Sequence, residues 1–139
     1  MSTIGFDTSN YTTSTAWTDG KTDINVRQIL YVKDGERGIR QSDGVFQHMK
    51  LMPVMYEKLS EQIDFKDVKA VGVSTRPRCV EGSYMPVFLA GEGYAKVVAN
   101  TLGVPLYEFS HQDGHIMAGI YSSGSFELLE NDFISVHLS

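Results

Sequence analysis

The sequence predicts an α/β fold in which helices pack on a mixed five-stranded sheet. Apolar and polar residues alternate over much of residues 3–32, and apolar residues recur at steps of three and four over residues 42–63. A nearly continuous run of small apolar residues covers residues 68–75. These patterns are typical of half-buried strands, of an amphipathic helix and of a strand buried on both faces. The predicted order is strand-strand-strand-helix-strand-helix-strand-helix.

The first third of the chain predicts an antiparallel meander. We expect strands at residues 3–8, 12–18 and 24–32, because these segments alternate or are rich in threonine with one tryptophan. Asp19 and Gly20 separate the second strand from the third, and Asp-Gly is a strong hairpin signal. Short turns between consecutive strands place them side by side as antiparallel neighbours.

A helix is predicted over residues 42–63. Pro53 lies inside this pattern, and we expect it to kink the helix because it removes the bond to the Met49 carbonyl. His48 lies off the main apolar stripe, so the sequence favours a histidine at the surface or in an interface. The apolar stripe itself consists of Val45, Met49, Met52, Tyr56, Leu59 and Ile63.

The middle of the chain predicts two further strands joined by a helix. The buried run at residues 68–75 is followed by a loop over residues 75–78. We expect a helix over residues 83–102, with Ser83 as its N-cap and Gly103 just after its end. A short strand over residues 105–109 follows.

Residues 110–121 are the most informative stretch and read as the start of a third helix. Ser110 is a good N-cap, and Asp113 three residues later approximates a capping box. Residues four apart on a helix share one face, with Cβ atoms about 5–6 Å apart. His111 and His115 can therefore point two imidazoles at one metal ion. The alternative is two unrelated histidines near a helix start, one solvated and one hydrogen-bonded.

The bulk composition excludes several classes of protein. The 139 residues carry a net charge of −5, which argues against a dedicated nucleic-acid module. The single cysteine excludes an internal disulfide and fits a reducing compartment. No apolar run approaches 18 residues and no signal pattern stands at the N-terminus, so we expect a cytoplasmic protein that does not act in a membrane.

The predicted element order is the arrangement of ribonuclease-H-like domains and of each half of the actin–hexokinase superfamily. Residues 132–139 alternate cleanly and predict one more strand. We therefore expect an N-terminal ribonuclease-H-like subdomain over residues 1–125. Residues 126–139 are expected to be the first strand of a truncated second subdomain.

With these residues in view, the chain resembles the N-terminal half of the glycoprotease-like family, the tRNA threonylcarbamoyladenosine transferases. Residues 110–115, Ser-His-Gln-Asp-Gly-His, are similar to that family's Asn-His-Leu-Glu-Gly-His. Residues 4–9, Ile-Gly-Phe-Asp-Thr-Ser, look like its first strand and phosphate-proximal turn. Residues 75–78 occupy the place of its Thr-Arg-Gly-Pro-Gly loop, and residues 93–96 look like its Gly-x-Ser-x-Ala-Lys segment.

The resemblance implies a metal site, a nucleotide site and a partner. His111 and His115 would be two ligands of a catalytic iron or zinc, with a further aspartate ligand in a second half. ATP or a threonylcarbamoyl adenylate would bind between the halves, and members of the family commonly pair with a paralogous subunit through their first two helices. In this chain those helices are residues 42–63 and 84–102. We expect them to bind either such a paralogous subunit or a second copy of this chain. We expect tRNA binding only with the second half or with partners.

Residues near the expected nucleotide depart from the family pattern. Ser9 and Asn10 would lie close to the phosphates, but Asn10, Tyr11 and Thr12 replace the family's acidic pair. Arg76 and Arg78 replace loop glycines and could hold a phosphate, although solvated surface arginines fit equally well. Asp7 could orient a magnesium ion or its waters, or be a mere strand-end aspartate.

Three functions follow, and the chain looks like a divergent paralogue of the family. The first is the N-terminal half of a metal-dependent threonylcarbamoyl transferase-like enzyme acting in tRNA modification, in which case we expect the 139-residue piece alone to be inactive. The second is a non-catalytic scaffold that binds a partner. The third is a metallopeptidase, as the family was formerly described (O-sialoglycoprotein endopeptidase), which is disfavoured because Gln112 stands where H-E-x-x-H has its glutamate base.

Overall fold

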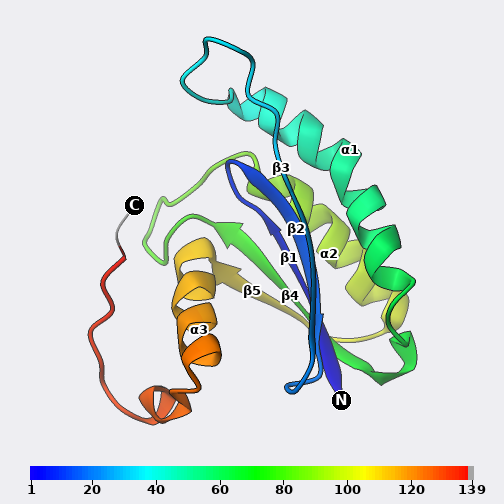
Figure 1. Cartoon of the computed structure of the whole chain (residues 1–139), viewed down its shortest axis with the longest axis vertical. Helices are drawn as coiled ribbons and strands as arrows, with labels where there is room; N and C mark the ends of the chain where they lie inside the picture. Colours follow the sequence, from blue (N-terminus) through cyan, green and yellow to red (C-terminus); the bar gives the residue numbers. More distant parts are fainter. Residues whose placement is uncertain (138–139) are drawn as a thin grey trace.

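Five strands form one mixed sheet in the order β3-β2-β1-β4-β5 in the computed structural model, which describes residues 1–137 (Figure 1). The meander β1–β2–β3 is antiparallel, whereas β4 and β5 run parallel to β1. The strands are β1 (Ser2–Thr8), β2 (Thr12–Thr18), β3 (Asp23–Ile29), β4 (Val68–Arg76) and β5 (Leu106–Ser110). The helices are α1 (Gln41–Ser60), α2 (Phe88–Leu102), α3 (His111–Ser123) and the short 3-10 helices η1 (Phe65–Asp67) and η2 (Phe126–Glu130).

The predicted element order and the mixed five-stranded sheet are confirmed. The second strand has the predicted bounds, and the third ends at Ile29 rather than at residue 32. The second helix begins at Phe88 rather than at residue 83, because residues 77–87 form a loop in which Ser83 accepts a hydrogen bond from the Arg78 backbone N–H at 2.9 Å. Ser83 is therefore not the N-cap.

The two faces of the sheet are covered by different helices. Figure 1 shows α1 and α2 on one side and α3 on the other. The main core lies between the sheet and the α1–α2 layer, where Ile4 and Phe6 of β1 meet Met52 and Leu59 of α1 and Ala95 of α2. All five side chains are at most 3% exposed. This packing fixes the strands whose ends carry the candidate site.

Helix α2 approaches β1 very closely at Gly91. The Thr8 hydroxyl accepts a hydrogen bond from the Gly91 backbone N–H at 2.9 Å and donates one to the Val87 carbonyl at 2.8 Å. A Cβ added at Gly91 would lie 2.8 Å from the Thr8 Oγ1, a distance that real Cβ atoms essentially never show. Glycine is therefore required here for the close approach of the two backbones.

The predicted strand at the end of the chain is wrong for the part that the structure describes. Residues 126–130 form η2, and residues 132–137 run without strand pairing, while residues 138 and 139 lie outside the described residues. Alternation alone does not make a strand, because a strand needs a neighbour for its backbone hydrogen bonds. No helix among the described residues is long and apolar enough to cross a membrane.

Candidate metal centre

The candidate site lies where the parallel strands of the sheet end. Asp7 stands one residue before the end of β1, and Ser110 is the last residue of β5. His111 is the first residue of α3, which begins directly after β5. Because parallel strands bring their carboxyl ends to the same edge, this topology places side chains from β1 and α3 together.

The start of α3 is held by the predicted capping box. The Ser110 hydroxyl accepts from the Asp113 backbone N–H at 3.1 Å, and the Asp113 carboxylate accepts from the Ser110 backbone N–H at 3.0 Å. Both bonds satisfy N–H groups that have no partner within the helix. The orientation of the first helical turn, which carries His111, is thereby fixed.

His111 and His115 converge on one another, as their spacing predicts. Their Nε2 atoms are 2.8 Å apart. The ring centres are 4.4 Å apart, and the two planes are nearly perpendicular at 83°. Two nitrogens at this distance either share one proton or face a common cation.

Asp7 binds the other side of the His111 ring. Its Oδ2 lies 2.8 Å from the His111 Nδ1, and its Oδ1 accepts the Ser9 backbone N–H at 2.9 Å. Since a carboxylate can only accept, the proton of this bond belongs to the His111 Nδ1. The Nε2 of His111 is then the nitrogen that is free to share a proton or to bind a metal.

The pKa values in this cluster are shifted by its own contacts. Burial raises the pKa of Asp7, but hydrogen bonds from His111 and Ser74, with the charge of His111 and the Ser9 N–H, outweigh burial and leave it below 3.8. The hydrogen bond and charge of Asp7 raise the pKa of His111 above 6.5 against its partial burial. Burial and the charges of His111 and His137 lower the pKa of His115. Asp7 therefore remains ionised and His115 remains neutral at neutral pH.

The histidine pair fits a divalent transition metal. With metal–nitrogen bonds of about 2.1 Å, two ligand nitrogens lie about 3.0 Å apart at 90° and about 3.4 Å apart at the tetrahedral angle. The observed 2.8 Å therefore needs only a small opening of the pair. A carboxylate on the far nitrogen of a ligating histidine is a common arrangement around protein-bound metals. Within residues 1–137, no three His, Cys, Asp or Glu side chains already surround one point.

His48 was placed wrongly from the sequence. Instead of lying at a surface or in an interface, its side chain is fully buried. Its Nδ1 lies 2.7 Å from the Thr13 hydroxyl and its Nε2 2.8 Å from the Ser9 carbonyl. The carbonyl accepts the Nε2 proton, and the Thr13 hydroxyl donates to Nδ1. His48 lies on the buried face of α1, one turn from Gly44 and one turn from Met52, whereas Met49 of the predicted stripe is 47% exposed. The sequence prediction therefore chose the wrong face of this helix.

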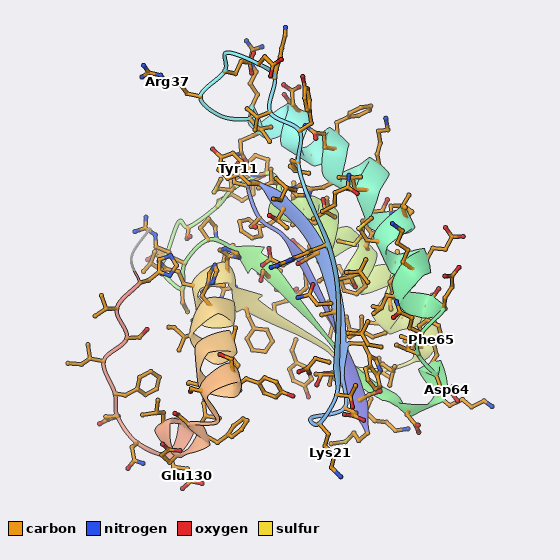
Figure 2. The ribbon with its side chains drawn as sticks, in the orientation of Figure 1. Tyr11, Lys21, Arg37, Asp64, Phe65 and Glu130 are labelled. Carbon is orange, nitrogen blue, oxygen red and sulfur yellow. The ribbon has the colours of Figure 1, made fainter. Side chains whose placement is uncertain are left out.

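The remaining predicted residues lie in the turn after β1, at the end of β4 and in the loop that follows β4. Asn10 accepts a hydrogen bond from the Gln41 side chain at 3.0 Å, so the turn after β1 is tied to the start of α1. Figure 2 shows Tyr11 at this same end of the sheet, and its side chain is 46% exposed. Arg76 donates to the Thr75 hydroxyl at 3.2 Å, and its charge acts on Asp113 of α3. Arg78 is exposed in the loop after β4.

The fold and the site define a class of protein. A mixed five-stranded sheet of this order, with helices on both faces, is a ribonuclease-H-like fold, the fold of each half of actin–hexokinase proteins. The structure of YeaZ from Pseudomonas aeruginosa superposes with a TM-score of 0.55 at 16% identity, covering 79% of this chain and 43% of that chain. A second structure, an uncharacterized protein with similarity to peptidase YeaZ from the same organism, gives a TM-score of 0.57 at 14% identity, with coverages of 78% and 43%.

Sequence comparison then finds relatives that share one description. A tRNA N6-adenosine threonylcarbamoyltransferase of Pyrobaculum calidifontis is 29% identical over 128 residues, covering 91% of this chain and 36% of that protein. The proteins of the same description from Christiangramia forsetii and Clostridium kluyveri are 30% and 37% identical over 64% and 51% of this chain, which is 25% and 20% of their own lengths. No family model matches the chain. The chain is a partial and divergent homologue of the tRNA N6-adenosine threonylcarbamoyltransferases, and it spans about a third or less of the length of these relatives.

Proposed function

We propose that this chain is the N-terminal, metal-binding part of a threonylcarbamoyl transferase-like protein that acts in tRNA modification. The convergence of the His111 and His115 Nε2 atoms at 2.8 Å carries the proposal. The homology to tRNA N6-adenosine threonylcarbamoyltransferases supports the reaction class. In this proposal His111 and His115 hold an iron or zinc ion.

Each residue of the site has a separate task in this proposal. Asp7 keeps the Nδ1 of His111 protonated and the ring in place, so that the Nε2 lone pair points toward the metal. The capping box holds the helix turn on which His111 stands. A bound metal would supply electrostatic stabilisation of charge that develops during transfer of a carbamoyl group to an amine.

A nucleotide would bind beside the same strand ends. ATP or a threonylcarbamoyl adenylate, with magnesium, is the expected ligand, and its phosphates would lie near Ser9, Asn10, Arg76 and Arg78. The Ser9 backbone N–H donates to the Asp7 carboxylate and the Gln41 side chain donates to Asn10, so this turn is held at the strand ends by two hydrogen bonds. The arginine charges would complement phosphate.

A protein partner would bind the face formed by α1 and α2. An apolar groove of about 530 Å³ lies there, lined by residues that include Met52, Pro53, Val54 and Val97. Val54 and Val97 are 45% and 63% exposed. A paralogous subunit or a second copy of this chain is the proposed occupant, and tRNA would be bound together with further parts of the assembly.

One observation favours a second function, that of a non-catalytic partner-binding paralogue. The turn after β1 carries Asn10 and the half-exposed Tyr11 where the family has an acidic pair, so two carboxylates are missing from this edge of the site. Such a protein would bind its partner without turnover. A metallopeptidase is less favoured, because Gln112 offers no general base beside the histidines.

Metal binding of the purified chain tests the proposal. We expect about one equivalent of zinc or iron by elemental analysis, lost in both His111→Ala and His115→Ala with unchanged circular dichroism. Lys50→Ala is the control, because this exposed side chain lies on α1. Absence of metal in the parent from about pH 6 to about pH 9, a range over which imidazoles become neutral, would overturn the metal-dependent function in favour of the partner-binding one.

Activity is the second readout. Threonylcarbamoyladenosine in the tRNA of a strain depleted of its own transferase would be restored by a longer protein containing this chain. The 139 residues alone are expected not to restore it, since the match covers about a third or less of the relatives. Turnover by the purified chain alone would contradict that expectation.

A further inference from the structure

A third imidazole lies beside the histidine pair. The ring centres of His115 and His137 are 5.1 Å apart, with an angle of 47° between their planes. The His115 ring is therefore a neighbour of both the His111 ring and the His137 ring. His137 comes from the last described part of the chain and not from a helix or strand.

The turn after α3 brings this segment back to the site. The helix ends at Gly124 in the left-handed conformation, and η2 follows. Tyr121 and Phe126 pack edge to face with ring centres 5.9 Å apart, and the Asn131 side chain donates to the Glu127 carbonyl at 2.8 Å. Residues 131–137 then run back alongside α3 toward the end of the sheet where α3 begins (Figure 1). We call residues 131–137 the return segment.

The ring separations match those of ligands on a shared ion. An imidazole centre lies about 3.2 Å from a metal bound through one of its nitrogens, so two ligand rings are about 4.5 Å apart at 90° and about 5.2 Å apart at the tetrahedral angle. The observed values are 4.4 Å for His111–His115 and 5.1 Å for His115–His137. His137 still has to turn about its side-chain bonds, because no three such groups within residues 1–137 already surround one point. Its exposed position leaves room for that rotation.

We propose that His137 supplies a third imidazole to the metal that His111 and His115 hold. The inference rests on the proposed metal site and assigns the third ligand to this chain's own return segment. Three protein ligands with an open fourth position are typical of catalytic zinc, whereas two histidines alone leave most of the coordination sphere to water. The metal would also fasten the return segment to the start of α3.

Zinc affinity of the full 139-residue chain tests this assignment by competition with a chromophoric chelator. We expect His137→Ala to weaken zinc binding at least tenfold, and His111→Ala and His115→Ala to weaken it more. Ser135→Ala is the matched control, because Ser135 is also exposed in the return segment but is a poor metal ligand. Its affinity should equal that of the parent.

Cobalt absorption gives a second readout that does not depend on affinity. With saturating Co²⁺, the parent should show the intense visible bands of a four-coordinate ion, and His137→Ala should show weaker bands as water replaces nitrogen. Parent-like affinity and spectrum in His137→Ala, with binding lost in His111→Ala, would overturn the role of His137 and leave the two-histidine site standing. Failure of the parent to bind zinc would overturn both proposals.

Discussion

Two histidine environments lie within one end of this sheet and differ in what their nitrogens face. His48 is fully buried, and both of its nitrogens are used, one by the Thr13 hydroxyl and one by the Ser9 carbonyl. His111 is partly exposed, and only its Nδ1 is used by a partner from another element, the Asp7 carboxylate. Its Nε2 faces another imidazole.

The comparison shows that partner chemistry, and not residue type, separates a structural histidine from a candidate ligand. A hydroxyl and a carbonyl satisfy a neutral ring completely and leave nothing to offer a metal. A carboxylate on one nitrogen fixes the tautomer and leaves the other lone pair available. The pKa values follow the same division, since burial lowers that of His48 and the bond to Asp7 raises that of His111.

The largest effect is expected from His48→Ala. Both hydrogen-bonding partners of the ring would lose their bonds in a buried site, and a cavity would form, so we expect a loss of about 2–3 kcal/mol in the free energy of unfolding. Urea unfolding measures it, with Lys50→Ala on the exposed face of α1 as the control. Zinc affinity of the folded variant should stay within about threefold of the parent. This change is smaller than the one expected when a group that orients a metal ligand is lost. A loss of metal as complete as in His111→Ala would show that the two histidine environments do not differ in their importance for metal binding.

Asp7→Asn should have the next largest effect, which we expect to be a loss of zinc affinity. The amide keeps the shape of the carboxylate but not its charge, so the His111 ring is oriented less firmly and is a weaker ligand; we expect about tenfold weaker binding, about 1.4 kcal/mol. Glu108→Gln, an exposed carboxylate on β5, is the matched control in the same titration. Equal affinity of Asp7→Asn and the parent would show that Asp7 does not orient the site.

The smallest effect is a pH dependence of the metal-free protein. The raised pKa of His111 means that its ion pair with Asp7 stabilises the fold fully below the ordinary pKa of 6.5, and that this contribution is lost as the pH rises through the raised pKa. The difference in unfolding free energy between the parent and Asp7→Asn should therefore shrink by about 0.5 kcal/mol from pH 6 to pH 8.5. Urea unfolding at several pH values measures it, and a difference that grows with pH would contradict the assigned proton.

Local patterns predicted the parts of this structure that depend on local chemistry. The β2 bounds, the capping box at Ser110 and the convergence of His111 with His115 follow from alternation, caps and the helical period. The bond between Asp7 and His111 joins residues 104 apart in sequence. It depends on the register of β1, β4 and β5, which the sequence pattern does not set.

Two of the errors have a common physical origin. His48 lies off the stripe that the sequence predicted, yet it is on the buried face of α1, where Ser9 and Thr13 give it polar partners. Residues 132–137 alternate like a strand, yet they have no strand neighbour among the described residues. In both cases the deciding contact comes from another part of the chain.

The contact between Gly91 and Thr8 has a mechanical consequence. Thr8 hydrogen-bonds two backbone groups at the start of α2, and it is joined by a peptide bond to Asp7, which holds His111. A Cβ at position 91 would lie only 2.8 Å from the Thr8 Oγ1, so α2 and β1 are in direct contact at this point. We therefore expect a partner that displaces α2 from its outer face to displace the Asp7 carboxylate as well.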